Sequence, residues 1–312
     1  MNHGQVTAII PTFHPGAGLL ECVSSLDENG IRDIVIIDDG SDLDRSNATL
    51  RFLDEGIEAA DLKIRLIRKQ QNLGIANSLN IGVNQARESG LAQAILTIDQ
   101  DSRLPRGYVS SALQQLEQAH DEGIKVGLLA PSSIAGRNVK RDLNNAQTHW
   151  DHLFDPIQSG AVIPLETLDA VGLFDEDLVI DGVDTDFNYR CLEQGRSLLA
   201  VDGTNLSHAI GEPTPLELFG RPVRVFGRQI TVARHNPLRM YYISRNSILI
   251  ARAHRRHLGW RRVLRRQLMD VPSVILSVTV DKNRTANRQA VRAALQDARR
   301  GFKGQRPAGS VR

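Results

Sequence analysis

The chain has 312 residues, of which 41% are hydrophobic and 24% charged. This length allows one large domain or two smaller ones, and the composition is ordinary for a globular protein. The two cysteines, Cys22 and Cys191, provide neither a disulfide framework nor a metal-binding spacing. Strand-like residues begin at Val6, so we expect no signal peptide. The longest late apolar run, Val271–Val280, is far shorter than the roughly 20 residues of a membrane span, so we expect a cytoplasmic protein.

Charge is divided unevenly along the chain. Residues 217–312 carry 22 Lys and Arg against 4 Asp and Glu, whereas the first 216 residues carry 16 basic and 32 acidic side chains. This division indicates that the C-terminal segment meets an anionic partner. Phospholipid head groups, nucleic acid and a lipid-diphosphate acceptor all have the required charge. The alternative is a solvated helical segment that only balances an acidic domain.

The first half of the chain alternates short apolar runs with helical patterns. The apolar runs predict buried strands over Val6–Pro11, Ile34–Ile37, Ile64–Ile67, Ala94–Ile98 and Val126–Ala130. The spacing between them predicts helices over Gly18–Asn29, Leu43–Gly56, Ile75–Ser89 and Tyr108–Gly123. This alternation predicts an α/β fold with a mostly parallel sheet and helices on both faces.

The second half has a different pattern. Gln158–Ile163 and Ser197–Val201 extend the predicted sheet, and a helix from Asp184 to Gly195 lies between them. From about Arg234 onward the pattern is helical and rich in Arg, with Val271–Val280 ambiguous between strand and helix. We therefore expect a catalytic or binding domain over residues 1–233 and a basic helical region over 234–312, packed on that domain or at a membrane surface.

Acidic residues follow two of the predicted strands. One strand ends on Asp38 and Asp39 before Gly40, and another ends on Asp99 and Asp101. Ligands of parallel sheets bind at the carboxyl ends of strands, and an Asp-x-Asp pair suits a hard divalent cation such as Mg²⁺ or Mn²⁺. Asp after a strand is also a common turn former or helix cap, but two such pairs in one sheet favour a ligand site.

Two further candidates lie downstream. Asp184 and Asp186 fall at the start of a predicted helix, where a carboxylate also favours the helix dipole. His208 falls at the end of a predicted strand, although a single histidine is more often structural than a ligand. By chemistry alone these residues remain open between a structural and a catalytic role.

Several motifs, in this order, resemble glycosyltransferase family 2. They are Ile9-Ile-Pro-Thr-Phe, Ile37-Asp-Asp-Gly-Ser-Asp, Asn72-Leu-Gly-Ile-Ala-Asn-Ser-Leu-Asn-Ile-Gly, Asp99-Gln-Asp, Ser159-Gly-Ala and Gly182-Val-Asp-Thr-Asp-Phe-Asn-Tyr-Arg. More narrowly, three stretches resemble bacterial rhamnosyltransferases: Asp99-Gln-Asp-Ser, Arg239-Met-Tyr-Tyr-Ile-Ser-Arg-Asn and Ala294-Leu-Gln-Asp-Ala-Arg-Arg-Gly. The resemblance covers roughly residues 5–304. It implies a GT-A fold and an inverting, metal-dependent sugar transfer.

The resemblance also implies roles for individual residues. Those expected to contact the nucleotide-sugar are Thr12, Asp38, Asp39, Asn72, Gly74, Asn80 and Asp99, with Asp38 favoured over Asp39 for the base and Asp99 at the ribose or sugar. Asp101, with Asp99 and His208, is expected to hold Mg²⁺ or Mn²⁺ on the diphosphate. Asp184 takes the place of the family's general base, with Asp186 as the alternative. Val183 replaces the glutamate that usually precedes this base, which is a departure from the family pattern.

The implied donor is a nucleoside-diphosphate sugar, with dTDP-L-rhamnose first, and the implied acceptor is a hydroxyl of a glycan or lipid-linked acceptor. The basic region, in which Arg is interleaved with Leu, Ile and Trp, resembles a helix that lies on an anionic membrane surface, and equally an ordinary helix that packs its apolar side on the catalytic domain. A sugar-nucleotide nucleotidyltransferase is the first alternative, but no basic residue follows the first strand closely enough to bind phosphate. A non-enzymatic anionic-polymer binder is the second, and 4% aromatic residues disfavour a nucleic-acid partner.

Overall fold

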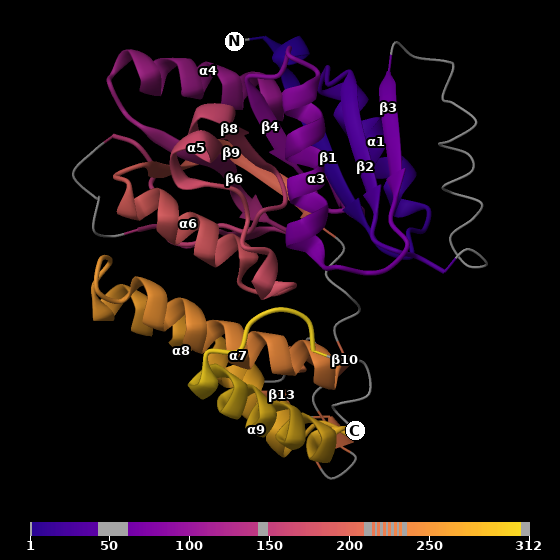
Figure 1. The fold of residues 1–312 in the computed structure, drawn as a ribbon, viewed down its shortest axis with the longest axis vertical. Coiled ribbons are helices and arrows are strands. Elements are labelled where there is room, and N and C mark those ends of the chain that lie inside the picture. The colour runs from indigo at the N-terminus through magenta and orange to yellow at the C-terminus, as the bar shows by residue number, and fades with distance from the viewer. Residues whose placement is uncertain are drawn as a thin grey trace. The chain divides into compact units, whose positions relative to one another are not determined.

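The structure of the protein, a computed structural model, describes residues 2–42, 62–142, 149–208 and 236–306, and short paired strands between residues 214 and 232. The chain divides into two compact units (Figure 1). The first contains Met1–Glu176 and Asp184–His208, and the second contains Asp177–Val183 and Ala209–Arg312. The boundary predicted between residues 233 and 234 lies outside the described residues.

The first unit is built on a sheet with the strand order β3-β2-β1-β4-β8-β6-β9-β5, and β7 pairs with β6. The strands are β1 (Val6–Thr12), β2 (Asp33–Asp38), β3 (Lys63–Arg68), β4 (Ala94–Thr97), β5 (Ser102–Arg103), β6 (Val126–Ile134), β7 (Arg137–Asn138), β8 (Ala161–Pro164) and β9 (Ser197–His208). β1 runs parallel to β2 and β4, β2 to β3, and β6 to β9. β8 is antiparallel to both β4 and β6. The predicted mostly parallel sheet is confirmed.

Helices cover both faces of this sheet (Figure 1). The helices associated with the first unit are α1 (Gly18–Glu28), α3 (Ile75–Glu88), α4 (Tyr108–Asp121), α5 (Leu165–Val171) and α6 (Val183–Glu193). All but α5 were predicted within a few residues. The helix expected over Leu43–Gly56 lies outside the described residues.

The alternation of side chains along the strands explains why both faces are covered. Ala8 and Ile10 of β1 are fully buried in a cluster that includes residues of α1 and α4. Ile9, between them, is also fully buried and points to the opposite face, where α3 packs. A side chain at Gly82 of α3 would collide with Ile9, so glycine is required for this close approach.

The second unit consists mainly of α7 (Pro237–His254), α8 (Trp260–Thr279) and α9 (Arg284–Arg300). Tyr241 and Tyr242 of α7 are buried in one cluster with Ala290 and Ala294 of α9. The ambiguous run Val271–Val280 is helical up to Thr279, with Pro272 inside α8. Short hairpin strands precede these helices: β10 (Thr214–Pro215), β11 (Glu217–Leu218), β12 (Arg221–Pro222), β13 (Arg224–Val225), β14 (Arg228–Gln229) and β15 (Thr231–Val232). Among the described residues, no helix combines the length and apolarity that a bilayer crossing requires.

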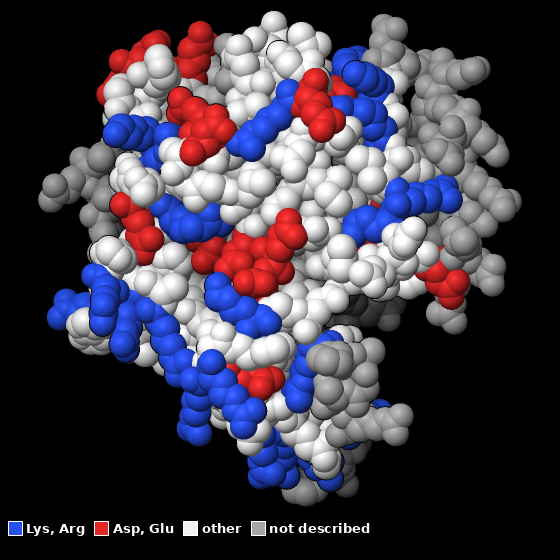
Figure 2. Space-filling view, viewed as in Figure 1, with Lys and Arg blue, Asp and Glu red and all other residues white. Residues whose placement is uncertain are grey.

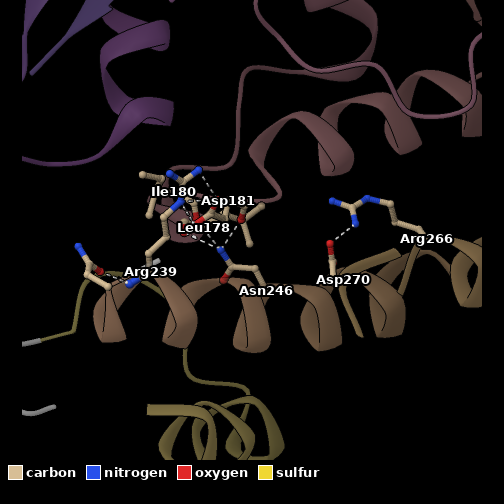
Figure 3. A network of polar contacts seen from close by, with 8 residues as sticks. Leu178, Ile180, Asp181, Arg239, Asn246, Arg266 and Asp270 are labelled. Atoms are coloured by element: carbon tan, nitrogen blue, oxygen red, sulfur yellow. Dashed lines mark hydrogen bonds and ion pairs between the residues drawn. The ribbon is translucent and has the colours of Figure 1, made fainter. Parts of the chain in front are cut away.

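A polar network in the second unit holds the segment Asp177–Val183 (Figure 3). The Asn246 amide donates to the carbonyl oxygens of Leu178, Ile180 and Asp181 over 2.7–2.9 Å. Fully buried Arg245 donates to the carbonyl oxygen of Asp177 over 3.0 Å, so two adjacent residues of α7 fix one loop.

Candidate active site

The carboxyl ends of β1, β2 and β4 meet at one edge of the sheet. Thr12, the last residue of β1, is the register partner of Asp38, the last residue of β2. The Thr12 hydroxyl is buried and donates to the carbonyl oxygen of Ile37 over 3.3 Å. β4 runs parallel to β1 and leads directly to Asp99. The predicted nucleotide contacts at these strand ends are therefore placed along one edge, as ligand sites of parallel sheets require.

Asp38 is buried at this edge. Its carboxylate accepts a hydrogen bond from the Ser41 hydroxyl, and the Ser41 oxygen accepts from the backbone N–H of His14 over 2.7 Å. Ser41 therefore connects the end of β2 to the turn that follows β1. One carboxylate oxygen of Asp38 is used in this contact.

Asp39 is committed to the protein itself. Its two oxygens accept from the backbone N–H groups of Leu73 and Gly74 over 2.8 and 3.0 Å, and the buried Lys69 ammonium pairs with it over 2.5 Å. Gly40 follows with φ of 72°, and a side chain there would collide with the backbone of Gln71. These contacts fix the loop before α3. The preference for Asp38 over Asp39 as the nucleobase contact stays a prediction.

The predicted nucleotide-loop residues have distinct structural contacts. The Asn72 side chain accepts from the N–H of Gly74 over 3.1 Å, and Gly74 caps α3 with φ of 93°. Asn80, inside α3, exchanges hydrogen bonds with both backbone groups of Phe174 at 3.0 Å. It also donates to the Glu176 carboxylate over 2.8 Å. In the structure Asn80 therefore joins α3 to the segment before α6, and its nucleotide role stays a prediction.

The Asp-Gln-Asp stretch is held by contacts from two other segments. The Gln158 amide donates to the Asp99 carboxylate, and the Ser159 hydroxyl accepts from the N–H of Asp99 over 3.0 Å. Gln100 exchanges two hydrogen bonds with the backbone of Phe13, at 2.9 and 3.2 Å. The latter contacts tie the end of β4 to the end of β1. Gln100 and Ser159 belong to the motifs quoted above, but their type alone indicated no such role.

His208 reaches the acidic pair through strand pairing. Ser102 of β5 and His208 of β9 are register partners, and their Oγ and Nδ1 atoms lie 2.8 Å apart. The Ser159 hydroxyl donates to Ser102 over 3.0 Å, which completes a chain of contacts from Asp99 to His208. His208 Nδ1 lies 3.7 Å from Asp101 and 4.0 Å from Asp99.

The ligand atoms of Asp99, Asp101 and His208 all lie within 4.8 Å of one another. Burial raises the pKa of the Asp99 carboxyl. The charge of His208 lowers this pKa, Asp101 raises it, and hydrogen bonds from Gln158 and Ser159 lower it. Two carboxylates and one imidazole are a fitting donor set for Mn²⁺ or Mg²⁺, and a cation would offset the repulsion between the carboxylates. These residues thus form a candidate metal site within the first unit.

The two candidate bases differ in their surroundings. Asp184 lies in the first turn of α6, is partly exposed, and accepts from the N–H of Thr185 over 2.8 Å. Asp186 is buried and paired with Arg190 over 2.8 Å, while Arg190 also donates to the Val171 carbonyl oxygen over 2.6 Å. The ion pair with Arg190 gives Asp186 a structural role in anchoring α6. Asp184 has the greater access to solvent.

Asp155 fixes the start of α6 and was not identified from the sequence. Its two carboxylate oxygens accept from Thr185 Oγ1 over 2.9 Å and from Asn188 Nδ2 over 2.8 Å. Asp155 lies in the same connection as Gln158 and Ser159, which contact Asp99. One short segment therefore contacts both the acidic pair and the helix that carries Asp184.

Fold and site together define the GT-A class of glycosyltransferases, which use nucleotide-sugars and carry acidic residues at strand ends. The chain belongs to glycosyl transferase family 2, whose family model matches residues 7–163. It is 28% identical over 312 residues to the dTDP-rhamnosyl transferase RfbF of Shigella flexneri. The similarity extends over 97% of this chain and 98% of the relative. The protein is therefore a glycosyltransferase that resembles a rhamnosyltransferase over almost its entire length.

Solved structures show the same fold. The crystal structure of S. aureus TarS 1-349 in complex with UDP-GlcNAc matches with a TM-score of 0.60 at 15% identity, covering 96% of this chain and 81% of that chain. The crystal structure of GalNAc-T7 with UDP, GalNAc and Mn²⁺ matches with a TM-score of 0.55 at 14% identity, covering 86% and 57% of the two chains. At these identities the likeness concerns the architecture.

Proposed function

We propose that the protein is an inverting glycosyltransferase that moves L-rhamnose from dTDP-L-rhamnose to a hydroxyl of a glycan or lipid-linked acceptor in cell-surface polysaccharide synthesis. The observation that carries this proposal is the cluster of Asp99, Asp101 and His208 at the sheet edge of a family 2 chain. The full-length similarity to a dTDP-rhamnosyl transferase supports the donor. Family membership favours sugar transfer over nucleotidyl transfer and over non-enzymatic binding of an anionic polymer.

In this proposal the strand ends bind the donor. Asp38 and Thr12 contact the nucleoside, while the loop shaped by Asn72 and Gly74 covers it and Asp39 holds that loop in place. Asp99 faces the ribose or sugar. The Asp99 carboxylate accepts from the Gln158 amide, and the Asp99 backbone N–H donates to the Ser159 hydroxyl. These two contacts orient the carboxylate before the donor arrives.

Asp184 acts as the general base. Its carboxylate takes the proton of the acceptor hydroxyl while the hydroxyl oxygen forms a bond to the anomeric carbon. The bond from that carbon to the diphosphate oxygen breaks, and the nucleoside diphosphate leaves from the opposite face, which inverts the configuration. Asp186 is less suited to this step because Arg190 already occupies its carboxylate.

Asp101, Asp99 and His208 would hold Mg²⁺ or Mn²⁺. When bound, such an ion supplies positive charge next to the leaving diphosphate. Ser102 supports this site by contacting His208 Nδ1, since the orientation of a ligating imidazole depends on its partners.

The acceptor is proposed to be presented at the inner face of the cell membrane. The net positive charge of residues 217–312 supports this, because an anionic leaflet attracts basic segments. The low aromatic content supports a lipid surface over nucleic acid.

A donor-hydrolysis screen tests the proposed activity. Purified protein with Mn²⁺ is incubated separately with dTDP-L-rhamnose and with UDP- and GDP-sugars, and the released nucleoside diphosphate is measured. We expect dTDP-L-rhamnose to be hydrolysed fastest, and Asp101→Ala to remove this activity. Preferential hydrolysis of a UDP- or GDP-sugar would contradict the proposed donor, and no hydrolysis or transfer with any donor would contradict the activity.

A further inference from the structure

One face of α8 exposes a continuous apolar stripe. Trp260, Leu264, Leu268, Val271 and Ile275 recur at spacings of three and four residues, which places them on one side of a helix. Each is 40–65% exposed. Val263 and Ser277 of the same helix are buried, so α8 packs by a different face. Large apolar side chains in such an array are unusual on a globular surface and mark an interaction site.

Positive charge flanks this stripe. Arg255 and Arg256 are exposed in the turn before α8, and Arg261 is exposed in its first turn, where its guanidinium lies 5.6 Å from the Trp260 ring centre. No acidic residue occurs between Arg255 and Met269, and the first one, Asp270, is paired with Arg266 over 2.7 Å. Figure 2 shows Lys and Arg side chains gathered along the surface of the second unit where α8 lies in Figure 1.

We propose that α8 lies in the interface of an anionic lipid bilayer, with its apolar stripe among the upper acyl chains and the flanking arginines at the head groups. An interfacial helix needs an apolar face, a basic flank and no full membrane span, and α8 has all three. Arginine stems extend along apolar surface while their charges remain in water, and tryptophan favours the head-group level.

Charge complementarity selects this occupant over a second copy of the chain. Two copies joined through the stripe would bring their flanking arginines together without acidic partners on the same face. An anionic leaflet instead neutralises each arginine. The second half of α8, Val271–Thr279, carries no charge at all, which suits contact with acyl chains.

Only the purpose of the attachment rests on the proposed function, because α8 would bring the catalytic unit to a lipid-linked acceptor. The attachment itself is a property of the helix and is independent of any sugar transfer. It therefore has a readout that needs no donor, acceptor or metal.

Trp260 provides that readout in the full-length protein. The chain has two tryptophans, and Trp150 is 8% exposed whereas Trp260 is 65% exposed. Fluorescence of a Trp150→Phe variant reports Trp260 alone. We expect a blue shift with phosphatidylcholine vesicles that contain phosphatidylglycerol, and quenching by lipids brominated on their upper acyl carbons. If Trp150→Phe does not fold, the difference between wild type and Trp260→Phe gives the same information.

Two sets of variants separate the stripe from the charge. The combined change Leu264→Ser, Leu268→Ser and Ile275→Ser should weaken vesicle partitioning at least about tenfold. The combined change Arg256→Gln and Arg261→Gln should weaken vesicle partitioning about fivefold for each charge removed. This effect should be smaller at high salt, because salt screens exposed charges. Matched controls are Leu91→Ser with Leu295→Ser, and Arg137→Gln with Lys140→Gln, all at exposed positions outside α8.

The outcomes are distinct. Equal partitioning to neutral and anionic vesicles, or none to either, would overturn the proposal. A dimer in light scattering that the stripe variants convert to monomer would also overturn it, because the stripe would then bind a second copy. Loss of vesicle binding by the stripe and arginine variants, with their hydrolysis of dTDP-L-rhamnose unchanged, would support the proposal. Vesicle binding by a chain that hydrolyses no donor would retain it while removing the proposed function.

Discussion

The side-chain amide of Asn246 donates to the backbone carbonyl of Asp181 over 2.7 Å, although the two residues are 65 positions apart. Asp181 has φ of 61°, and Val179, two residues before it, has φ of 66°. Positive φ is costly for a residue with a side chain, above all for a β-branched one. The segment keeps this conformation because Asn246 binds three of its carbonyl groups and Arg239 pairs with the Asp181 carboxylate over 3.1 Å.

We expect Asn246→Ala to destabilise the second unit by about 1–3 kcal/mol, because it removes the hydrogen bonds that the Asn246 amide donates to the carbonyl oxygens of Leu178, Ile180 and Asp181. Thermal or urea denaturation followed by circular dichroism measures this. Ser247→Ala is the control, since Ser247 contributes only its backbone carbonyl to the hydrogen bond with Gln267. A stability loss no larger than that of Ser247→Ala would show that the segment Asp177–Val183 keeps its conformation without the hydrogen bonds from Asn246.

Asp101→Ala should abolish the metal-dependent part of donor binding and leave the fold intact. Asp101 is exposed and lies 3.7 Å from His208 Nδ1, so its removal deletes a ligand without opening a cavity. Calorimetric titration with dTDP in the presence and absence of Mn²⁺ is the measurement, and Asp121→Ala, an exposed aspartate of α4, is the control. Unchanged Mn²⁺-dependent affinity would remove Asp101 from the metal site.

Ser159→Ala should weaken Mn²⁺ binding by about 10–100-fold, the usual scale for losing a partner behind a metal ligand. Ser159 Oγ links the backbone of Asp99 to Ser102, which contacts His208. Mn²⁺ titration by electron paramagnetic resonance follows the free ion directly. Ser132→Ala, on β6, is the control, because the Ser132 hydroxyl hydrogen-bonds to the backbone of Thr204.

Asp99→Asn should raise the melting temperature of the metal-free protein at neutral pH while lowering Mn²⁺ affinity at least about tenfold. Burial raises the pKa of Asp99, so ionisation of this carboxyl costs more in the folded than in the unfolded protein. That cost is present above the raised pKa and disappears below the unfolded pKa of about 4, where the carboxyl is neutral in both states.

Thermal scans in EDTA across this pH range measure the difference between wild type and Asp99→Asn. It should be largest near neutral pH and vanish in acid. The exposed control Asp121→Asn should show no such pH dependence. A lower melting temperature for Asp99→Asn at neutral pH would mean that the ionised carboxylate stabilises the fold.

Asp184→Asn should lower kcat by at least about 10²-fold with donor affinity changed only a few fold, the pattern expected for loss of a general base. Asp186→Asn should mainly reduce stability, because it breaks the partly buried ion pair with Arg190. Transfer kinetics and melting curves of the two variants are compared. If Asp186→Asn costs more in kcat while its fold stays intact, Asp186 is the base.

Local pattern was sufficient to locate most of the first unit. The β1 and β2 runs are apolar and short because both faces of these strands are covered, which makes them recognisable without a partner. The acidic ends of β2 and β4 were equally visible, since the polar residues follow the apolar runs directly. α5 was missed because its seven residues, Leu165–Val171, are too few to show helical periodicity.

The tertiary structure decided which of these residues meet. Ser102 and His208 are 106 positions apart, and only the antiparallel pairing of β5 with β9 brings them together. Asp38 and Asp39 are neighbours in one motif, and only the structure shows that the Asp39 carboxylate is bound by two backbone N–H groups and Lys69. The composition of α8 indicated an amphipathic helix, but its exposed apolar stripe depends on which face packs against its neighbours. Such contacts between distant segments arise from packing, which no local pattern records.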